Sequence, residues 1–113
     1  MEQSLKMVKL VYDALDKKLA EDIQIIDIRK VSVIADYFII ATGKNKNHVQ
    51  TLIDDSQEAL ETAGFKMREM EGYRNGSWIL MDFGDIVVHI FDEESRNFYD
   101  LERIWKDGKI VTM

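Results

Sequence analysis

The sequence predicts a single α/β (α+β) domain, residues 1–113, in which helices flank a mixed five-stranded sheet. Three segments carry apolar residues at three- and four-residue spacing, which is typical of amphipathic helices. Five short segments are rich in β-branched and aromatic residues, which is typical of strands. No linker, repeat or low-complexity segment separates these elements, so we expect them to share one core.

The first half of the chain predicts two helices around two strands. Residues 4–20 place apolar side chains on one stripe and charged ones outside it, so this segment is expected to pack on a sheet. Residues 23–28 and 37–42 are short, apolar and β-branched, as buried strands are. A second helix is predicted from about residue 45, with an end at Gly64.

The second half predicts three strands and a helix. A short strand is expected over residues 65–70, and a hairpin over 77–83 and 86–91. Asp92 is a good N-cap for a following helix, in which Phe98, Leu101, Ile104 and Trp105 recur at helical spacing. The last seven residues look like a short tail. Since the segment between the second and third strands is long enough to be a crossover that contains a helix, we expect a parallel strand pair beside the antiparallel hairpin.

The hairpin has two apolar faces if Gly84 and Asp85 form its turn. Trp78 then faces Phe91, Leu80 faces His89 and Met81 faces Val88. The first face is wholly apolar and belongs on the core; it holds Ile79, Met81, Phe83, Ile86, Val88 and Ile90. The second face holds Trp78, Leu80, Asp82, Val87, His89 and Phe91.

The second hairpin face is too apolar to lie against water, because a half-solvated sheet would be mostly polar there. Two explanations have similar weight. A helix of the same chain covers the face, or the face is an exposed surface that binds a partner. In the second case Trp78 is the leading anchor residue, since tryptophan often contributes much of the binding energy of an interface.

Composition excludes several classes of function. With 21 acidic and 15 basic residues, the formal charge is −6, which disfavours direct, sequence-specific nucleic-acid binding. It does not disfavour a protein partner that itself lies on nucleic acid. No stretch approaches the ~20 apolar residues of a membrane helix, and no signal or transit peptide is recognisable, so we expect a soluble, cytoplasmic protein. The absence of cysteine excludes disulfides, thiolate chemistry and Cys-ligated zinc.

No catalytic or metal site is expected. Asp82 and Asp85 are three residues apart across a turn, where aspartate commonly makes local hydrogen bonds. His48 is expected to cap or pack near a helix start, and His89 to make a hydrogen bond at the hairpin surface. The alternative, a nucleotide-binding or nucleotidyltransferase-type enzyme, depends on the two aspartates, His89 and the fold implied below.

The chain resembles the ribosomal silencing factor (Iojap-related) family over about residues 4–105. The similarity is carried by DIRKVSVIADYFIIATGKNKNHV and EGYRNGSWILMDFGDIVVHIFDEESRNFYDLERIW. It implies a nucleotidyltransferase-like fold without catalytic residues or cofactor. It also implies binding to protein uL14 of the large ribosomal subunit, a steric block of subunit joining that represses translation, and a role in large-subunit biogenesis. The loop after Gly43 departs from relatives, in which it is commonly Ser-rich, and this weakens any role for loop hydroxyls.

The resemblance places the partner surface on the hairpin and the following helix. The expected partner-binding residues are Trp78, Leu80, Asp82, His89, Phe91, Glu93, Arg96, Tyr99 and Glu102, with Glu94 beside them. The apolar members would anchor the partner, the acids would complement basic neighbours, and Arg96 would orient the rim. An exposed apolar stripe can also pair with a second copy of itself, which leaves a homodimer open.

Overall fold

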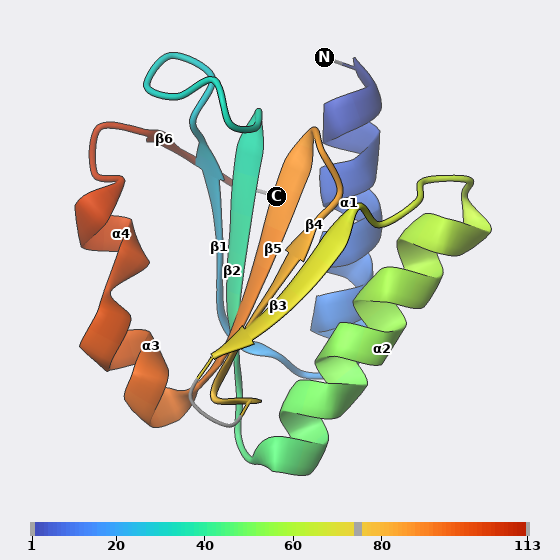
Figure 1. The fold of residues 1–113 in the computed structure, drawn as a ribbon, viewed down its shortest axis with the longest axis vertical. Coiled ribbons are helices and arrows are strands. Elements are labelled where there is room, and N and C mark those ends of the chain that lie inside the picture. The colour runs from blue at the N-terminus through green and yellow to red at the C-terminus, as the bar shows by residue number, and fades with distance from the viewer. Residues whose placement is uncertain (1, 74–75, 113) are drawn as a thin grey trace.

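The fold is a six-stranded mixed sheet with helices on both faces (Figure 1). The structure is a computed structural model, and it describes residues 2–73 and 76–112. The elements in chain order are α1 (Glu2–Lys17), β1 (Glu21–Asp27), β2 (Tyr37–Gly43), α2 (Lys46–Thr62), β3 (Glu69–Tyr73), β4 (Trp78–Asp82), β5 (Ile86–Asp92), α3 (Glu93–Tyr99), α4 (Leu101–Ile104) and β6 (Lys109–Val111). The single α+β domain with a mixed sheet is confirmed.

Local sequence explains where α2 begins and where α1 ends. The side chain of Asn45 accepts a hydrogen bond from the backbone N–H of His48, which caps the start of α2. At the end of α1, Leu19 adopts a left-handed backbone with φ 62°, while Ala20 N–H donates to the Leu15 carbonyl. This is the geometry of a Schellman cap, which usually has glycine at the left-handed position.

Three predictions for the second half need correction. The third strand begins at Glu69 rather than at residue 65. The C-terminal helix is broken in two at Asp100, which has a left-handed backbone with φ 47°. The predicted tail contains β6, which pairs antiparallel with β1, so the sheet has six strands rather than five. Three residues are too short a stretch for alternation to mark a strand.

The strand order is β3-β4-β5-β2-β1-β6, and only the central β2 and β5 pair in parallel. A parallel pair is therefore present as expected, but it joins the second strand to the fifth and not to the third, which pairs antiparallel with β4. The crossover between β2 and β5 contains α2, β3 and β4. Gly43 ends β2 where α2 passes close by. A Cβ atom at Gly43 would lie 2.7 Å from Cγ2 of Val49, so the position has no room for a side chain.

The two faces of the sheet are covered by different helices: α1 and α2 on one face, and α3 and α4 on the other (Figure 1). The first layer encloses the larger core, in which Met7, Leu15, Leu52 and Leu60 are almost fully buried. A second, smaller core forms under α3 and α4. Over the described residues, the helices are too short or too polar to span a membrane.

Candidate functional site

The hairpin of β4 and β5 has the predicted register. Trp78 pairs with Phe91, Leu80 with His89, and Met81 with Val88. Phe83 N–H donates to the carbonyl of Ile86 at 3.0 Å, and Gly84 in the turn has φ 87°, a conformation that favours glycine. Because side chains alternate along a strand, the register confirms both predicted faces.

The first hairpin face lies on the larger core, as predicted. Met81, Ile86, Val88 and Ile90 are inaccessible to solvent, and Phe83 is 6% exposed. Only Ile79, near the open end of the hairpin, is half-buried. Apart from Ile79, this face therefore contributes to stability and has no surface for a partner.

The second hairpin face is covered, but incompletely. Val87 and Phe91 are buried in the second core together with Leu101 of α4, so helices of the same chain cover its centre. Trp78 and Leu80 are only half-buried at its edge. Each of the two explanations drawn from the sequence describes part of the face. Its centre is covered, and its edge at Trp78 and Leu80, which we call the rim, is accessible.

Aromatic rings fill the space between this face and the helices. We call the set the aromatic layer: Phe38, Trp78, His89, Phe91, Tyr99 and Trp105. The indole of Trp78 stacks on Phe91, with centroids 5.1 Å apart, and lies against Tyr99 at 4.5 Å. Such contacts stabilise a ring beyond its burial alone. The orientation of the Trp78 side chain is thus restricted by its contacts with Phe91 and Tyr99.

His89 lies inside the aromatic layer and not at the surface, which corrects that part of the prediction. It is 3% exposed, and its Nδ1 accepts a hydrogen bond from Nε1–H of Trp78 at 3.2 Å, so the expected hydrogen bond is present. Burial lowers the pKa of His89 to about 3, because it disfavours the charged ring. The ring is therefore neutral near pH 7. Since Nδ1 accepts, the proton is on Nε2, which is buried and has no hydrogen-bond partner among the described residues.

Arg96 is also buried, and its three partners lie within the chain. Its guanidinium donates to the carboxylate of Glu102, to Thr42 Oγ1 at 2.8 Å and to the carbonyl of Asp22 at 2.7 Å. These bonds attach the α3–α4 corner to β1 and β2. Arg96 thus fixes α3 and α4, the helices next to the rim, to the sheet on which they pack. Sequence reasoning missed Asp22 and Thr42, because contacts across 74 and 54 residues leave no local pattern.

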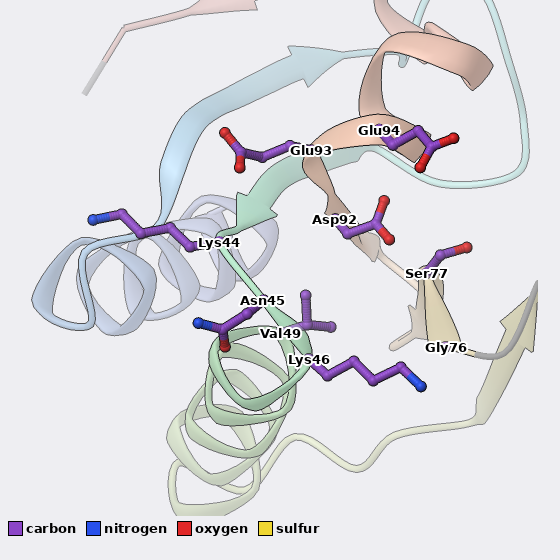
Figure 2. Close-up of a pocket in the computed structure, with 9 residues that line it drawn as sticks. All are labelled: Lys44, Asn45, Lys46, Val49, Gly76, Ser77, Asp92, Glu93 and Glu94. Carbon is purple, nitrogen blue, oxygen red and sulfur yellow. The ribbon is translucent and has the colours of Figure 1, made fainter.

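The predicted acidic residues occupy the start of α3. Asp92 caps this helix by accepting from the backbone N–H of Ser95 at 2.8 Å, as predicted. Glu93 and Glu94 follow it and are exposed. All three lie along one wall of an open cavity of about 450 Å³ (Figure 2). The opposite wall carries Lys44, Asn45, Lys46 and Val49.

This cavity does not gather one kind of charge. In Figure 2 the side chains of Lys44 and Lys46 point in different directions, and the other wall of the cavity carries the carboxylates of Asp92, Glu93 and Glu94. A tight anion site needs donors that converge on one point. The cavity is therefore not interpreted as a ligand site. Its relevance to binding is that Glu93 and Glu94, which line it, are accessible beside the hairpin.

The aspartates of the hairpin turn have structural contacts. Asp82 Oδ1 accepts from the backbone N–H of Gly84 at 2.8 Å, and the carboxylate of Asp85 accepts from Gln3 at 3.0 Å. The local hydrogen bond expected of a turn aspartate is thus present for Asp82, whereas the side chain of Asp85 joins the turn to α1. Across residues 2–73 and 76–112, no group of three or more His, Cys, Asp or Glu side chains is arranged to hold a metal ion.

His48 joins the start of α2 to the end of α1. Its Nδ1 accepts from the backbone N–H of Lys44, and its Nε2 lies 2.8 Å from the carbonyl of Lys18. The ring is thus fully used in packing two connections together. This confirms the structural role expected from its position.

The helix break at Asp100 changes which apolar side chains face outward. Leu101 is buried as the helical spacing predicts, but Phe98 is 68% exposed and Ile104 is 67% exposed. Both lie on the α3–α4 layer that frames the rim. The sequence analysis assigned both residues to one continuous helix with Leu101 and Trp105, and the break at Asp100 changes their relation to these two residues.

Comparison with known proteins identifies the chain's relatives. The family model described as "Ribosomal silencing factor during starvation" matches residues 1–113. "Ribosomal silencing factor RsfS" of Bacillus subtilis (strain 168) is 35% identical over 107 residues, covering 95% of this chain and 91% of the relative. "Mitochondrial assembly of ribosomal large subunit protein 1" of Mus musculus is 26% identical over 101 residues, covering 87% of this chain and 44% of the relative. A crystal structure of a Chromobacterium violaceum protein superposes with a TM-score of 0.86 at 32% identity, covering 96% of this chain and 90% of that one. The chain belongs to the ribosomal silencing factor family, as its sequence motifs predict.

Proposed function

We propose that this protein binds the large ribosomal subunit through protein uL14 and sterically blocks association with the small subunit, which represses translation. The observation that carries the proposal is the family match over residues 1–113. A large-subunit partner is further supported by the mouse relative, which is named for assembly of the mitochondrial large subunit. That name also supports a second role in large-subunit biogenesis.

The rim of the second hairpin face is the proposed contact surface. Trp78, Leu80 and Tyr99 are half-buried there, so each has apolar area left to bury against a partner. Interfaces concentrate their binding energy in a few such side chains near the centre of the patch. Trp78 is the proposed central anchor, since Phe91 and Tyr99 already hold its ring.

Acidic side chains around the rim supply the electrostatic part of the proposal. Glu93 and Glu94 are exposed, and Asp82 and Glu102 are half-buried. With a net charge of −6, the chain is attracted to the basic proteins that coat ribosomal RNA. Charges at a rim mainly speed association and select the partner, so their loss is expected to slow binding more than it speeds release.

Three of the expected partner-binding residues would act indirectly. His89, Phe91 and Arg96 are 3%, 0% and 7% exposed, so they have almost no surface to offer. Phe91 supports the indole of Trp78, and Arg96 holds the α3–α4 corner. Their proposed contribution is to shape the rim that the partner contacts.

The chain is not an enzyme: its family is named for ribosomal silencing, a regulatory role, as expected from the sequence. The proposed mechanism requires only that the bound protein occupy space on the joining face of the large subunit. It therefore requires no substrate and no cofactor. We place this action in the cytoplasm, with the ribosomes of the cell.

Sedimentation of ribosomal subunits tests the proposal. Purified large and small subunits are run through a sucrose gradient at physiological salt, with and without the protein. We expect the protein to migrate with large subunits and the peak of joined ribosomes to disappear. Binding without loss of joined ribosomes would contradict the steric block, and absence of binding would contradict the partner.

We also propose that the free protein can pair with a second copy through the same rim. If the rim serves both contacts, a homodimer and the large subunit must compete. Analytical ultracentrifugation of the free protein should then show a dimer that the Trp78→Glu substitution abolishes. A dimer that this substitution leaves intact would place the pairing elsewhere.

A further inference from the structure

The indole of Trp78 is held by a hydrogen bond from within the sheet. Its Nε1–H donates to Nδ1 of His89, which lies on the neighbouring strand β5. Trp78 pairs in register with Phe91, so His89 is its diagonal neighbour on the same face. A half-exposed side chain is thus attached to an almost fully buried one.

The imidazole cannot easily turn away from the indole. Phe38 packs edge-on against it, with centroids 4.8 Å apart, and only 3% of the residue is exposed. Because His89 is almost fully buried, a rotated ring could not readily exchange the indole for water, and it would leave the Nε1–H of Trp78 without this acceptor. The hydrogen bond therefore selects one orientation of the indole among those that stacking on Phe91 would allow.

We propose that His89 is a positioning residue for ribosome binding: its Nδ1 holds the Trp78 indole in the orientation that the partner contacts, while His89 itself touches no partner atom. This inference rests on the proposed function. A side chain that is ordered before binding loses less freedom on binding, so affinity rises without a new contact. The unpaired Nε2–H fits this account, because a group retained only for packing would be better replaced by an apolar ring.

A double-mutant cycle with His89→Phe and Trp78→Phe separates positioning from packing. His89→Phe keeps a ring in the buried space but removes the acceptor, and Trp78→Phe removes the donor. We expect His89→Phe to weaken large-subunit binding roughly tenfold, as the loss of one hydrogen bond implies. In the Trp78→Phe background the same substitution should have no further effect. His89→Asn, whose Oδ1 can replace Nδ1 as acceptor, should restore most of the affinity.

A spectroscopic measurement on the free protein keeps the two proposals distinguishable. The chain has two tryptophans, so its ¹H–¹⁵N spectrum has two indole N–H resonances, and Trp78→Phe assigns one by removing it. His89→Phe should shift the Trp78 resonance and His89→Asn should return it toward its original position, whether or not ribosomes bind. Thermal melting checks that each variant is folded.

Two results would overturn the inference. One is an equal loss of affinity from His89→Phe in both backgrounds, which would mean a purely structural role. The other is full affinity in His89→Phe while Trp78→Ala fails to bind, which would mean that the anchor needs no positioning. If Trp78→Ala binds normally, the proposed contact surface itself is wrong, and the positioning role falls with it.

Discussion

The two faces of the sheet are packed with different kinds of side chain. The face under α1 and α2 is sealed mainly by aliphatic side chains, and its hairpin members are almost all inaccessible. The face under α3 and α4 is filled by aromatic rings, and it buries a histidine and an arginine that are hydrogen-bonded to other elements. Its edge at Trp78 and Leu80 stays half-open.

This difference indicates a division of labour within one small domain. Aliphatic packing supplies stability without orienting any single side chain, because it is non-directional. Hydrogen bonds and stacked rings fix orientation, which a binding surface needs, but a buried polar group that loses its partner then destabilises the fold. We therefore expect substitutions on the first face to change stability alone, and substitutions on the second to affect binding as well.

The largest effect is expected from Arg96→Ala. It would leave Thr42, the carbonyl of Asp22 and the half-buried carboxylate of Glu102 without their donor, and at about 1–3 kcal/mol for each broken hydrogen bond the total cost is about 4 kcal/mol of unfolding free energy. Urea unfolding measures this. Arg103→Ala removes the same charge from an exposed position of α4 and should be nearly neutral. Equal effects of the two substitutions would contradict the structural role of Arg96.

On the first face, Leu52→Ala should cost about 3 kcal/mol, because it leaves a cavity at a fully buried position of α2. Leu5→Ala, at a position that is 42% exposed, is the matched control and should cost far less. The folded fraction of Leu52→Ala should bind large subunits as tightly as the unsubstituted protein. Weaker binding by fully folded protein would break the proposed separation of the two faces.

Acidification should destabilise the second face through His89. Its folded-state pKa of about 3 is below the unfolded value near 6.5, so the unfolded state binds the proton more readily. Stability from this group is complete above pH 6.5 and is lost as the pH falls toward 3, with about 2 kcal/mol lost by pH 5. Urea unfolding at pH 7.5 and pH 5 should show this loss in the unsubstituted protein and a smaller one in His89→Asn. The same loss in both proteins would contradict a neutral, buried His89.

The smallest expected effect is a gain from Leu19→Gly at the end of α1. Leu19 has φ 62° and is 72% exposed, so it strains the backbone and buries little. Glycine should relieve that strain and stabilise the fold by about 1 kcal/mol. Thermal unfolding measures the gain, while large-subunit affinity should not change. A lower melting temperature would show that the cap is not strained.

The hairpin and its two faces could be predicted from sequence because the physics there is local. Gly84 and Asp85 mark the turn, and alternation then assigns each side chain to a face. The length of the connection after the second strand indicated that a parallel pair exists, but not that β5 is the partner of β2. The capping role of Asp92 could be predicted from its position before the helix.

Other features could not be predicted because they depend on distant or exceptional residues. The break between α3 and α4 occurs at Asp100, which adopts a left-handed conformation. Because glycine is the residue usually found in that conformation, the sequence gives no signal of a break there. Strand β6 is defined by its pairing with β1, not by a pattern of its own. Periodicity shows that the second hairpin face must be covered, but not which helix covers it or how far.

The most direct test of the account compares Trp78→Glu with Thr62→Glu in binding to large ribosomal subunits. Both add one negative charge, the first at the half-open rim and the second at an exposed position at the end of α2, on the other side of the sheet. We expect both variants to fold, Thr62→Glu to sediment with large subunits as the unsubstituted protein does, and Trp78→Glu to remain at the top of the gradient, because a charge buried in the interface has no partner. Normal binding by folded Trp78→Glu, or loss of binding by Thr62→Glu, would contradict the assignment of the docking surface to the second face.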